Sequence, residues 1–167
     1  ISDHYDGRRF FNPWGVNNTK SLWDVLKWKL SSTPARWPAP PIANAIKPQV
    51  LASAASRNIH ATYIGHATVY LQGSGGGRQR HVLTDPQFSQ RASPVSFAGP
   101  SRSRPPALSI ADLPSVDTVV VSHNHYDHLD LPSLIALRKR FDPFFFVPLG
   151  NAALLRGEGI TKIVELD

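Results

Sequence analysis

Asp117-Thr-Val-Val-Val-Ser-His-Asn-His-Tyr-Asp-His128 is the stretch of this sequence that decides the fold. Residues 117–122 are largely apolar and β-branched, which predicts a central strand buried on both faces. Four side chains that bind metal ions follow at once: His123, His125, Asp127 and His128. α/β domains build their sites at the carboxyl ends of strands, so this order predicts an α/β domain with a metal site beside the strand.

The spacing within residues 123–128 points to two metal ions. In an extended backbone His123 and His125 point to the same side, so they can bind one ion together. Asp127 and His128 follow where the chain turns toward the next helix, which lets them face a second ion and act in catalysis. Two ions so close together can activate a shared water and polarise a phosphoryl or carbonyl group. A chain of this composition shows the pattern by chance in roughly one case per thousand.

Composition limits the kinds of site and partner. The net charge of +6 is spread along the 167 residues, which favours anionic partners of any kind, whether phosphate esters, lipid headgroups or nucleic acid. There is no cysteine, so a metal site here must use nitrogen and oxygen ligands. No apolar run approaches the roughly 18 residues of a membrane-spanning helix. We therefore expect a soluble or peripheral protein, in the cytoplasm or at a membrane rather than secreted.

The chain divides near residue 57 into two kinds of sequence. Apolar residues recur at helical spacing from Thr19 to Leu30, which predicts a short amphipathic helix with Thr19 or Ser21 as its cap. A proline-rich stretch from Pro34 to Pro48 then predicts an extended arm. We expect residues 1–56 to form this helix and arm, and residues 57–167 to form the βα domain.

Beyond residue 57, short β-rich runs alternate with helical ones, which is typical of βα units. A flexible hairpin loop is expected at 73–77, and a long loop rich in Pro, Ser and Arg at 87–106, a length that is usually functional. The predicted strands are 61–72 (one strand or a pair), 81–84, 117–122, 144–147 and 161–166, and the predicted helices are 131–141 and 151–156.

Segments on both sides of the central motif carry a family resemblance. They are Ile64-Gly65-His66-Ala67-Thr68, Leu83-Thr84-Asp85-Pro86, Arg91-Ala92-Ser93-Pro94, Gly99-Pro100, Phe146-Val147-Pro148-Leu149-Gly150 and Glu165-Leu166-Asp167. The motif at 123–128 resembles that of the metallo-β-lactamase superfamily. The flanking segments look like its branch of N-acyl-phosphatidylethanolamine-hydrolysing phospholipases D.

The resemblance implies a ligand set and an architecture. His123 and His125 would bind the first zinc ion, and Asp127 and His128 the second. In the family a further His, a bridging Asp and a final His complete the site, and all three would lie beyond Asp167. The resemblance therefore implies the N-terminal half of a metallo-β-lactamase-type αββα sandwich, with residues 57–167 as a truncated first βα half.

Several other residues are candidates for the site. Asp85 resembles a family carboxylate that orients a ligand histidine, with a turn-forming Asp before Pro as the alternative. His66 is a candidate for the edge of a substrate pocket or an ordinary structural histidine. The loop arginines could bind a substrate anion, with solvated surface charge as the alternative; they are Arg91, Arg102 and Arg104. Asp130 is expected to cap the next helix rather than to bind metal.

The function that follows from the resemblance is a zinc phosphodiesterase acting on phospholipids like N-acyl-phosphatidylethanolamine. A nuclease or another ester or lactone hydrolase of the superfamily is one alternative, and a catalytically incomplete fragment that only folds or binds metal weakly is another. No stacking stripe of aromatic and basic residues marks a nucleic-acid groove, so no nucleic-acid partner is expected. The aromatic load of the N-terminal segment predicts packing on a core or, alternatively, peripheral membrane contact. A homo-oligomer is also expected.

Overall fold

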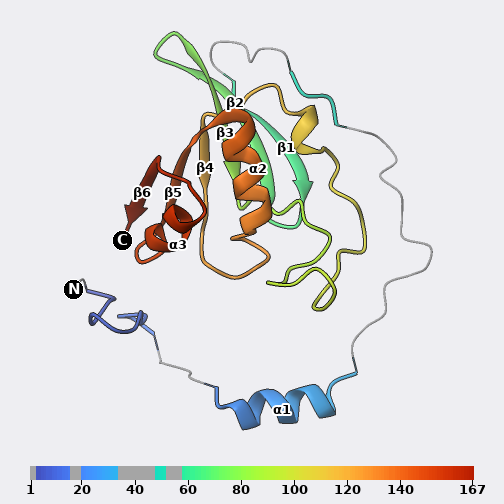
Figure 1. The fold of residues 1–167 in the computed structure, drawn as a ribbon, viewed down its shortest axis with the longest axis vertical. Coiled ribbons are helices and arrows are strands. Elements are labelled where there is room, and N and C mark those ends of the chain that lie inside the picture. The colour runs from blue at the N-terminus through green and yellow to red at the C-terminus, as the bar shows by residue number, and fades with distance from the viewer. Residues whose placement is uncertain (1–2, 16–19, 34–47, 52–57) are drawn as a thin grey trace. The chain divides into compact units, whose positions relative to one another are not determined.

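The computed structural model describes residues 3–15, 20–33, 48–51 and 58–167. It divides the chain into two compact units, residues 1–38 and 39–167, which are described separately (Figure 1). The predicted proline-rich arm lies outside the described residues except for its last residue, Pro48.

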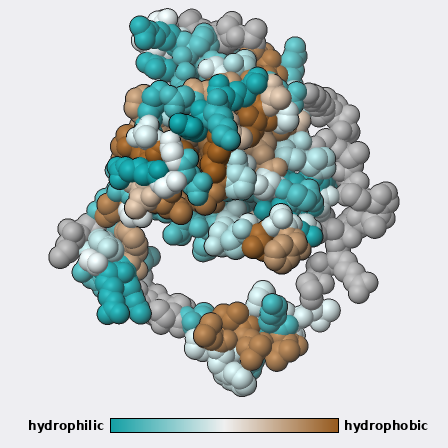
Figure 2. Space-filling view, in the orientation of Figure 1, coloured by the Kyte–Doolittle hydropathy of each residue, from teal (hydrophilic) through white to brown (hydrophobic). Residues whose placement is uncertain are grey.

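The first unit contains the helix α1, Leu22–Ser31. Ser21 begins it with a capping box, in which its hydroxyl accepts from the Asp24 N–H and the Asp24 carboxylate accepts from the Ser21 N–H. No residue of α1 is buried within its own unit, and the packing of its aromatic residues on a core stays a prediction. Trp23 and Trp28 are 71% and 66% exposed, and Figure 2 shows the apolar surface that α1 presents. Among the described residues no helix has the length and apolarity needed to cross a bilayer.

The second unit is a six-stranded mixed sheet whose strands lie side by side in chain order (Figure 1). The first three strands are antiparallel and the last four, from β3 onward, are parallel. Helices connect the last parallel strands, so the predicted α/β class is confirmed. The elements are β1 His60–Gly65, β2 Thr68–Gly75, β3 Arg78–Thr84, β4 Thr118–Val120, α2 Leu131–Phe141, β5 Phe144–Pro148, α3 Ala152–Gly157 and β6 Ile163–Leu166.

One face of the sheet forms the core. The strand register places Tyr70, Leu83, Val119 and Phe145 in one row across four strands, and each of them is fully buried. Helices α2 and α3 cover this row with the buried side chains Leu134, Leu137 and Leu155. Each such side chain contributes about 1.5–3 kcal/mol on burial, so this face holds the strand ends in place.

The opposite face of the sheet is apolar but only partly covered. Val120 is 36% and Phe144 53% exposed there, beside the half-buried Leu71 and Val82. Of the two faces that the sequence predicts to be buried, the described residues cover one, since Val119 is fully buried while Val120 on the other face is partly exposed. Apolar composition alone does not tell whether a second layer covers a strand.

A buried polar network ties the middle of β3 to the start of β4, away from the histidine motif. The Tyr70 hydroxyl donates to the Ser115 carbonyl at 2.7 Å and lies 2.5 Å from His81 Nδ1. Because a hydroxyl has one proton and donates it to Ser115, His81 Nδ1–H is the donor in the second bond. The Asp117 carboxylate accepts from the His81 backbone N–H at 2.8 Å and ties the start of β4 to β3.

We expect Tyr70→Phe to lower the free energy of unfolding by about 1–3 kcal/mol, because two buried polar partners lose their hydrogen bonds. Urea unfolding measures it. The matched control is Tyr63→Phe, since Tyr63 is exposed, and its effect should stay within about 0.5 kcal/mol. Equal stability of both variants would contradict the role of the network.

The same hydroxyl predicts a loss of stability at high pH. Burial, with the nearby Asp117 charge adding to it and the Ser115 bond opposing it, raises the pKa of Tyr70 from 10.0 to about 12. Between these two values the unfolded chain loses the proton while the folded chain keeps it, so stability that is present below pH 10 falls toward pH 12. Urea midpoints across this range should decline less steeply for Tyr70→Phe than for the unmodified chain.

Candidate metal centre

The site lies at the edge of the sheet where β3 and β4 end. Asp85 follows β3 directly, and Ser122 and His123 follow β4 after one further residue. The tight connection between β1 and β2 reaches the same edge, because Val69 near the start of β2 pairs with Thr84 at the end of β3. That connection carries His66. Three separate segments therefore bring polar side chains to one edge.

Asp85 joins two of these segments. Its carboxylate accepts from the Ser122 backbone N–H at 2.7 Å and from the Ser122 hydroxyl at 2.8 Å. The same carboxylate lies 3.0 Å from His128 Nδ1. The Asp85 backbone N–H donates to the Val120 carbonyl at 2.8 Å, so both its backbone and its side chain extend the β3–β4 pairing.

This network assigns the tautomers of two histidines. Because Ser122 gives its hydroxyl proton to Asp85, its oxygen accepts from His123 Nδ1–H, 2.9 Å away. His128 likewise donates from Nδ1, here to Asp85 itself. Both rings then carry a lone pair and no proton on Nε2, which is the form that binds a metal ion. One carboxylate thus orients two imidazoles, one directly and one through a serine.

His123 and His125 form the first pair of donors. His123 Nε2 and His125 Nδ1 lie 3.1 Å apart, with the ring centroids at 4.6 Å. Two nitrogens bound to one tetrahedral zinc ion at about 2.0–2.1 Å lie about 3.3 Å apart. The pair therefore fits a single ion, which would be bound through Nε2 of the first ring and Nδ1 of the second.

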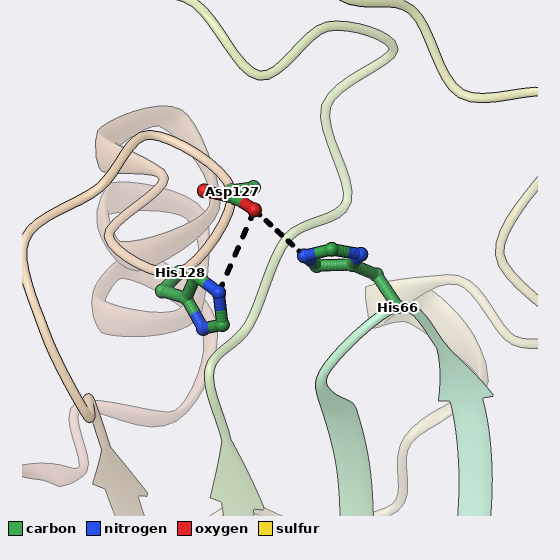
Figure 3. A group of neighbouring side chains, drawn as sticks. All are labelled: His66, Asp127 and His128. Carbon is green, nitrogen blue, oxygen red and sulfur yellow. Dashed lines mark hydrogen bonds and ion pairs between the residues drawn. The ribbon is translucent and has the colours of Figure 1, made fainter.

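Asp127 and His128 form a second group, and His66 joins it (Figure 3). Asp127 Oδ2 lies 2.8 Å from His66 Nε2 and 3.5 Å from His128 Nε2. Partial burial raises the pKa of Asp127, but its own backbone N–H, the hydrogen bond from His66 and the nearby His128 outweigh this, and the net pKa lies below its usual value. The carboxylate form that a metal ion requires is thereby favoured.

The motif with the histidine pair and with Asp127 and His128 lies in a part of the chain that matches a known protein family. Residues 80–166, more than half of the chain, match the family model described as the Beta-lactamase superfamily domain. The chain belongs to the metallo-β-lactamase superfamily.

Relatives match different shares of the chain. An uncharacterized protein of Mycobacterium tuberculosis is 42% identical over 149 residues, which is 87% of this chain and 37% of that protein. N-acyl-phosphatidylethanolamine-hydrolyzing phospholipase D 1 of Caenorhabditis elegans is 43% identical over 103 residues, 61% of this chain and 28% of its own length. A metal-dependent hydrolase of Pyrococcus furiosus is 30% identical over 105 residues, 63% of this chain and 39% of its own. The chain spans less than two fifths of each of these relatives.

The structure brings all four motif residues of the superfamily to one place, since the His123 and His128 ring centroids are 4.0 Å apart. Their roles as ligands, and that of Asp85 in orienting His128, stay predictions. The part played by Ser122 was missed in the sequence. A hydroxyl residue directly after an apolar strand and before the first histidine was the available signal.

The loop at 87–106 is tied down by its own arginines. Arg102 donates to the Ser89 carbonyl at 3.1 Å and to the backbone and side-chain oxygens of Gln87. Arg91 donates to the Gly99 carbonyl at 2.6 Å. These donors face loop oxygens, while Arg104 is exposed and has no such bond described. Anion binding by the three arginines stays a prediction. Among them, Arg104 is the one with no hydrogen bond to a loop oxygen described.

Asp130 stands at the N-cap position of α2, as predicted, but its side chain makes no capping hydrogen bond. It accepts instead from the Ser89 N–H at 3.0 Å and the Ser89 hydroxyl at 2.8 Å, and also from the Ser133 hydroxyl. The predicted capping hydrogen bond is therefore wrong. The Asp130 carboxylate instead anchors the loop at 87–106 to α2.

We expect Asp85→Asn to weaken zinc binding by about 10–100-fold, the usual effect of losing a carboxylate that orients a ligand histidine. Asn tolerates the left-handed backbone of Asp85, φ +39°, so the change removes the charge and keeps the turn. Competition with a chromophoric chelator measures the affinity. Asp142→Asn is the matched control, because Asp142 has a similar φ of +49° but lies at the far end of α2. Unchanged affinity in Asp85→Asn would exclude the orienting role.

Proposed function

We propose that this protein is a metal-dependent hydrolase, and more narrowly a zinc phosphodiesterase acting on phospholipids like N-acyl-phosphatidylethanolamine. The observation that carries the proposal is the convergence of two donor groups. His123 Nε2 and His125 Nδ1 are spaced for one ion, and Asp127 and His128 stand beside them for a second. The donor set contains only nitrogen and oxygen, which suits zinc.

The proposed chemistry needs no nucleophilic side chain. A bound divalent ion lowers the pKa of a water and polarises a phosphoryl oxygen. The residues of this chain hold the ligands in the correct tautomer through Asp85 and Ser122 and supply a carboxylate, Asp127, whose lowered pKa keeps it charged. This arrangement supports hydrolysis of an ester or phosphodiester.

The lipid substrate is supported by the name of the C. elegans relative and by the net charge of +6, which favours an anionic substrate. This relative matches only part of the chain, and the net charge and the site also suit substrates of other enzymes in the superfamily. A nuclease and a lactone or ester hydrolase are the competitors that the assay includes.

We further propose that the partly covered face of the sheet packs against a second sheet in the whole protein. Val120 and Phe144 expose apolar surface there, and the matching relatives are much longer than the aligned segment. In this arrangement residues 57–167 are the first βα half of the αββα sandwich, and the second half contributes the ligands that complete each ion.

Helix α1 supports peripheral membrane contact. It exposes Leu22, Trp23 and Trp28 beside Lys27 and Lys29. Short helices with exposed Trp and Leu and neighbouring Lys lie in the interface of anionic membranes. Such contact would bring the enzyme to a phospholipid substrate at the surface where it resides.

We expect zinc-loaded protein purified from the whole reading frame to release N-acylethanolamine from N-acyl-phosphatidylethanolamine in mixed micelles, and a chelator to abolish this. His125→Ala should reduce the rate by at least about a hundredfold, because even groups behind the ligands are worth about 10–100-fold. The matched control is His60→Ala, which should retain full activity because His60 begins β1, at the end of that strand away from His66.

Single-stranded nucleic acid and a lactone are tested in parallel. Activity on either of these without phospholipid cleavage would overturn the lipid assignment. Full activity of His125→Ala would overturn the metal role of the motif.

The membrane contact is tested by sedimentation with phosphatidylglycerol-containing vesicles. We expect the double variant Trp23→Ser, Trp28→Ser to bind the vesicles less tightly than the unmodified protein, and Tyr63→Ser, an exposed aromatic residue on β1, to bind as tightly. Added salt should weaken binding because the lysines contribute electrostatically. Equal binding of the double variant would exclude α1 as the contact.

A further inference from the structure

His66 occupies an unusual backbone position. It lies in the two-residue connection between β1 and β2 with φ +53°, after Gly65 with φ +146°. Non-glycine residues with such a φ are uncommon, although histidine is enriched among them, and they gather at functional sites. The imidazole on this connection is directed toward Asp127, in the segment between β4 and α2 (Figure 3).

The position of His66 is braced from the adjacent strand. The Thr68 hydroxyl donates to the Asp85 carbonyl at 2.8 Å and accepts from the Gln87 N–H at 3.1 Å. The Ala107 N–H donates to the Ile64 carbonyl at 2.8 Å. The turn that carries His66 is therefore fixed to the same segment that carries Asp85.

His66 Nε2 is aimed at a proposed metal ligand. It lies 2.8 Å from Asp127 Oδ2, and the donor atoms of His66, Asp127 and His128 all lie within 4.8 Å of one another. The His66 and His128 rings meet edge to face with centroids 5.3 Å apart. The His66 side chain is 48% exposed, so an ion can reach it from solvent.

We propose that His66 Nε2 is a third protein ligand of the ion held by Asp127 and His128. The proposal rests on the proposed metal-dependent function and adds a ligand from outside the motif at 123–128. His66 together with Asp127 and His128 gives two nitrogens and one oxygen from this chain, all of them atom types that zinc binds, and the ligands proposed from the second half of the protein would add to these three. Coordination through Nε2 requires the ring proton on Nδ1, so the hydrogen bond to Asp127 is exchanged for a bond to the ion.

A competing role for His66 is to orient Asp127 by hydrogen bond without touching the ion. Both roles predict weaker binding when the imidazole is lost, so affinity alone does not separate them. A direct bond between Nε2 and the ion does. Cadmium-113 bound to protein with ¹⁵N-labelled histidine shows scalar coupling only to the nitrogens that coordinate it.

The experiment uses metal-free protein from the whole reading frame and the variants His66→Asn and His66→Gly. Both residues accept the left-handed backbone, so the turn is kept while the ligand is lost. His60→Asn, at the other end of β1, is the matched control. Zinc affinity is measured by chelator competition, and circular dichroism verifies the fold.

We expect both His66 variants to bind one zinc ion at least about tenfold more weakly, His60→Asn to bind as the unmodified protein does, and His66 Nε2 to couple to cadmium-113. Unchanged affinity in the His66 variants, or absence of coupling at His66, overturns the proposal. The variant His128→Ala distinguishes a failure of His66 as a ligand from a failure of the metal site as a whole. If it loses zinc while the His66 variants do not, only the role of His66 fails, whereas zinc binding unaffected by either change rejects the metal site itself.

Discussion

The carboxylate of Asp85 is the constraint on which the histidine cluster depends. It accepts three hydrogen bonds, two from Ser122 and one from His128, across the ends of two parallel strands. Hydrogen bonds to charged groups contribute about 1.5–3 kcal/mol each, whereas a residue in the left-handed region costs about 1–3 kcal/mol. The bonds therefore outweigh the strain of Asp85 at φ +39°. This turn orders the segment after β4, so the imidazole rings of His123 and His128 are held in place by the chain itself.

Local sequence patterns were sufficient for most of the elements. α2 was predicted at its observed bounds, and β3, β5, α3 and β6 within a few residues, because apolar periodicity and strand propensity act over short distances. The four motif residues also converge because they are neighbours in the chain. The contact between His66 and Asp127 joins residues 61 positions apart, and it depends on the pairing of β2 with β3, which spacing does not encode. The burial of β4 is hard to predict for a related reason, since it depends on which layer covers each face of the sheet.

The loop at 87–106 shows how charge can be used inside a structure rather than on its surface. Burial lowers the pKa of Arg102, with the Asp130 charge opposing this, yet a guanidinium stays protonated in proteins. Its donors are directed to carbonyls of the loop, and Asp130 fastens the loop to α2 through Ser89. A charged residue in a long loop beside a site is thus a scaffold as readily as a substrate contact. Only the hydrogen-bond partners separate these two uses.

The order of the strands has a consequence for how the protein is made. Every strand of the sheet lies beside its neighbours in sequence, so each pairing is between segments that leave the ribosome in succession. Sheets with such local connections fold faster than those that must wait for distant segments. The segment from His123 to His128 is ordered by β3 and β4 on one side and is followed at once by α2. The four motif side chains and Asp85 can therefore come together during synthesis, from the N-terminal side onward, at the pace at which the polypeptide emerges.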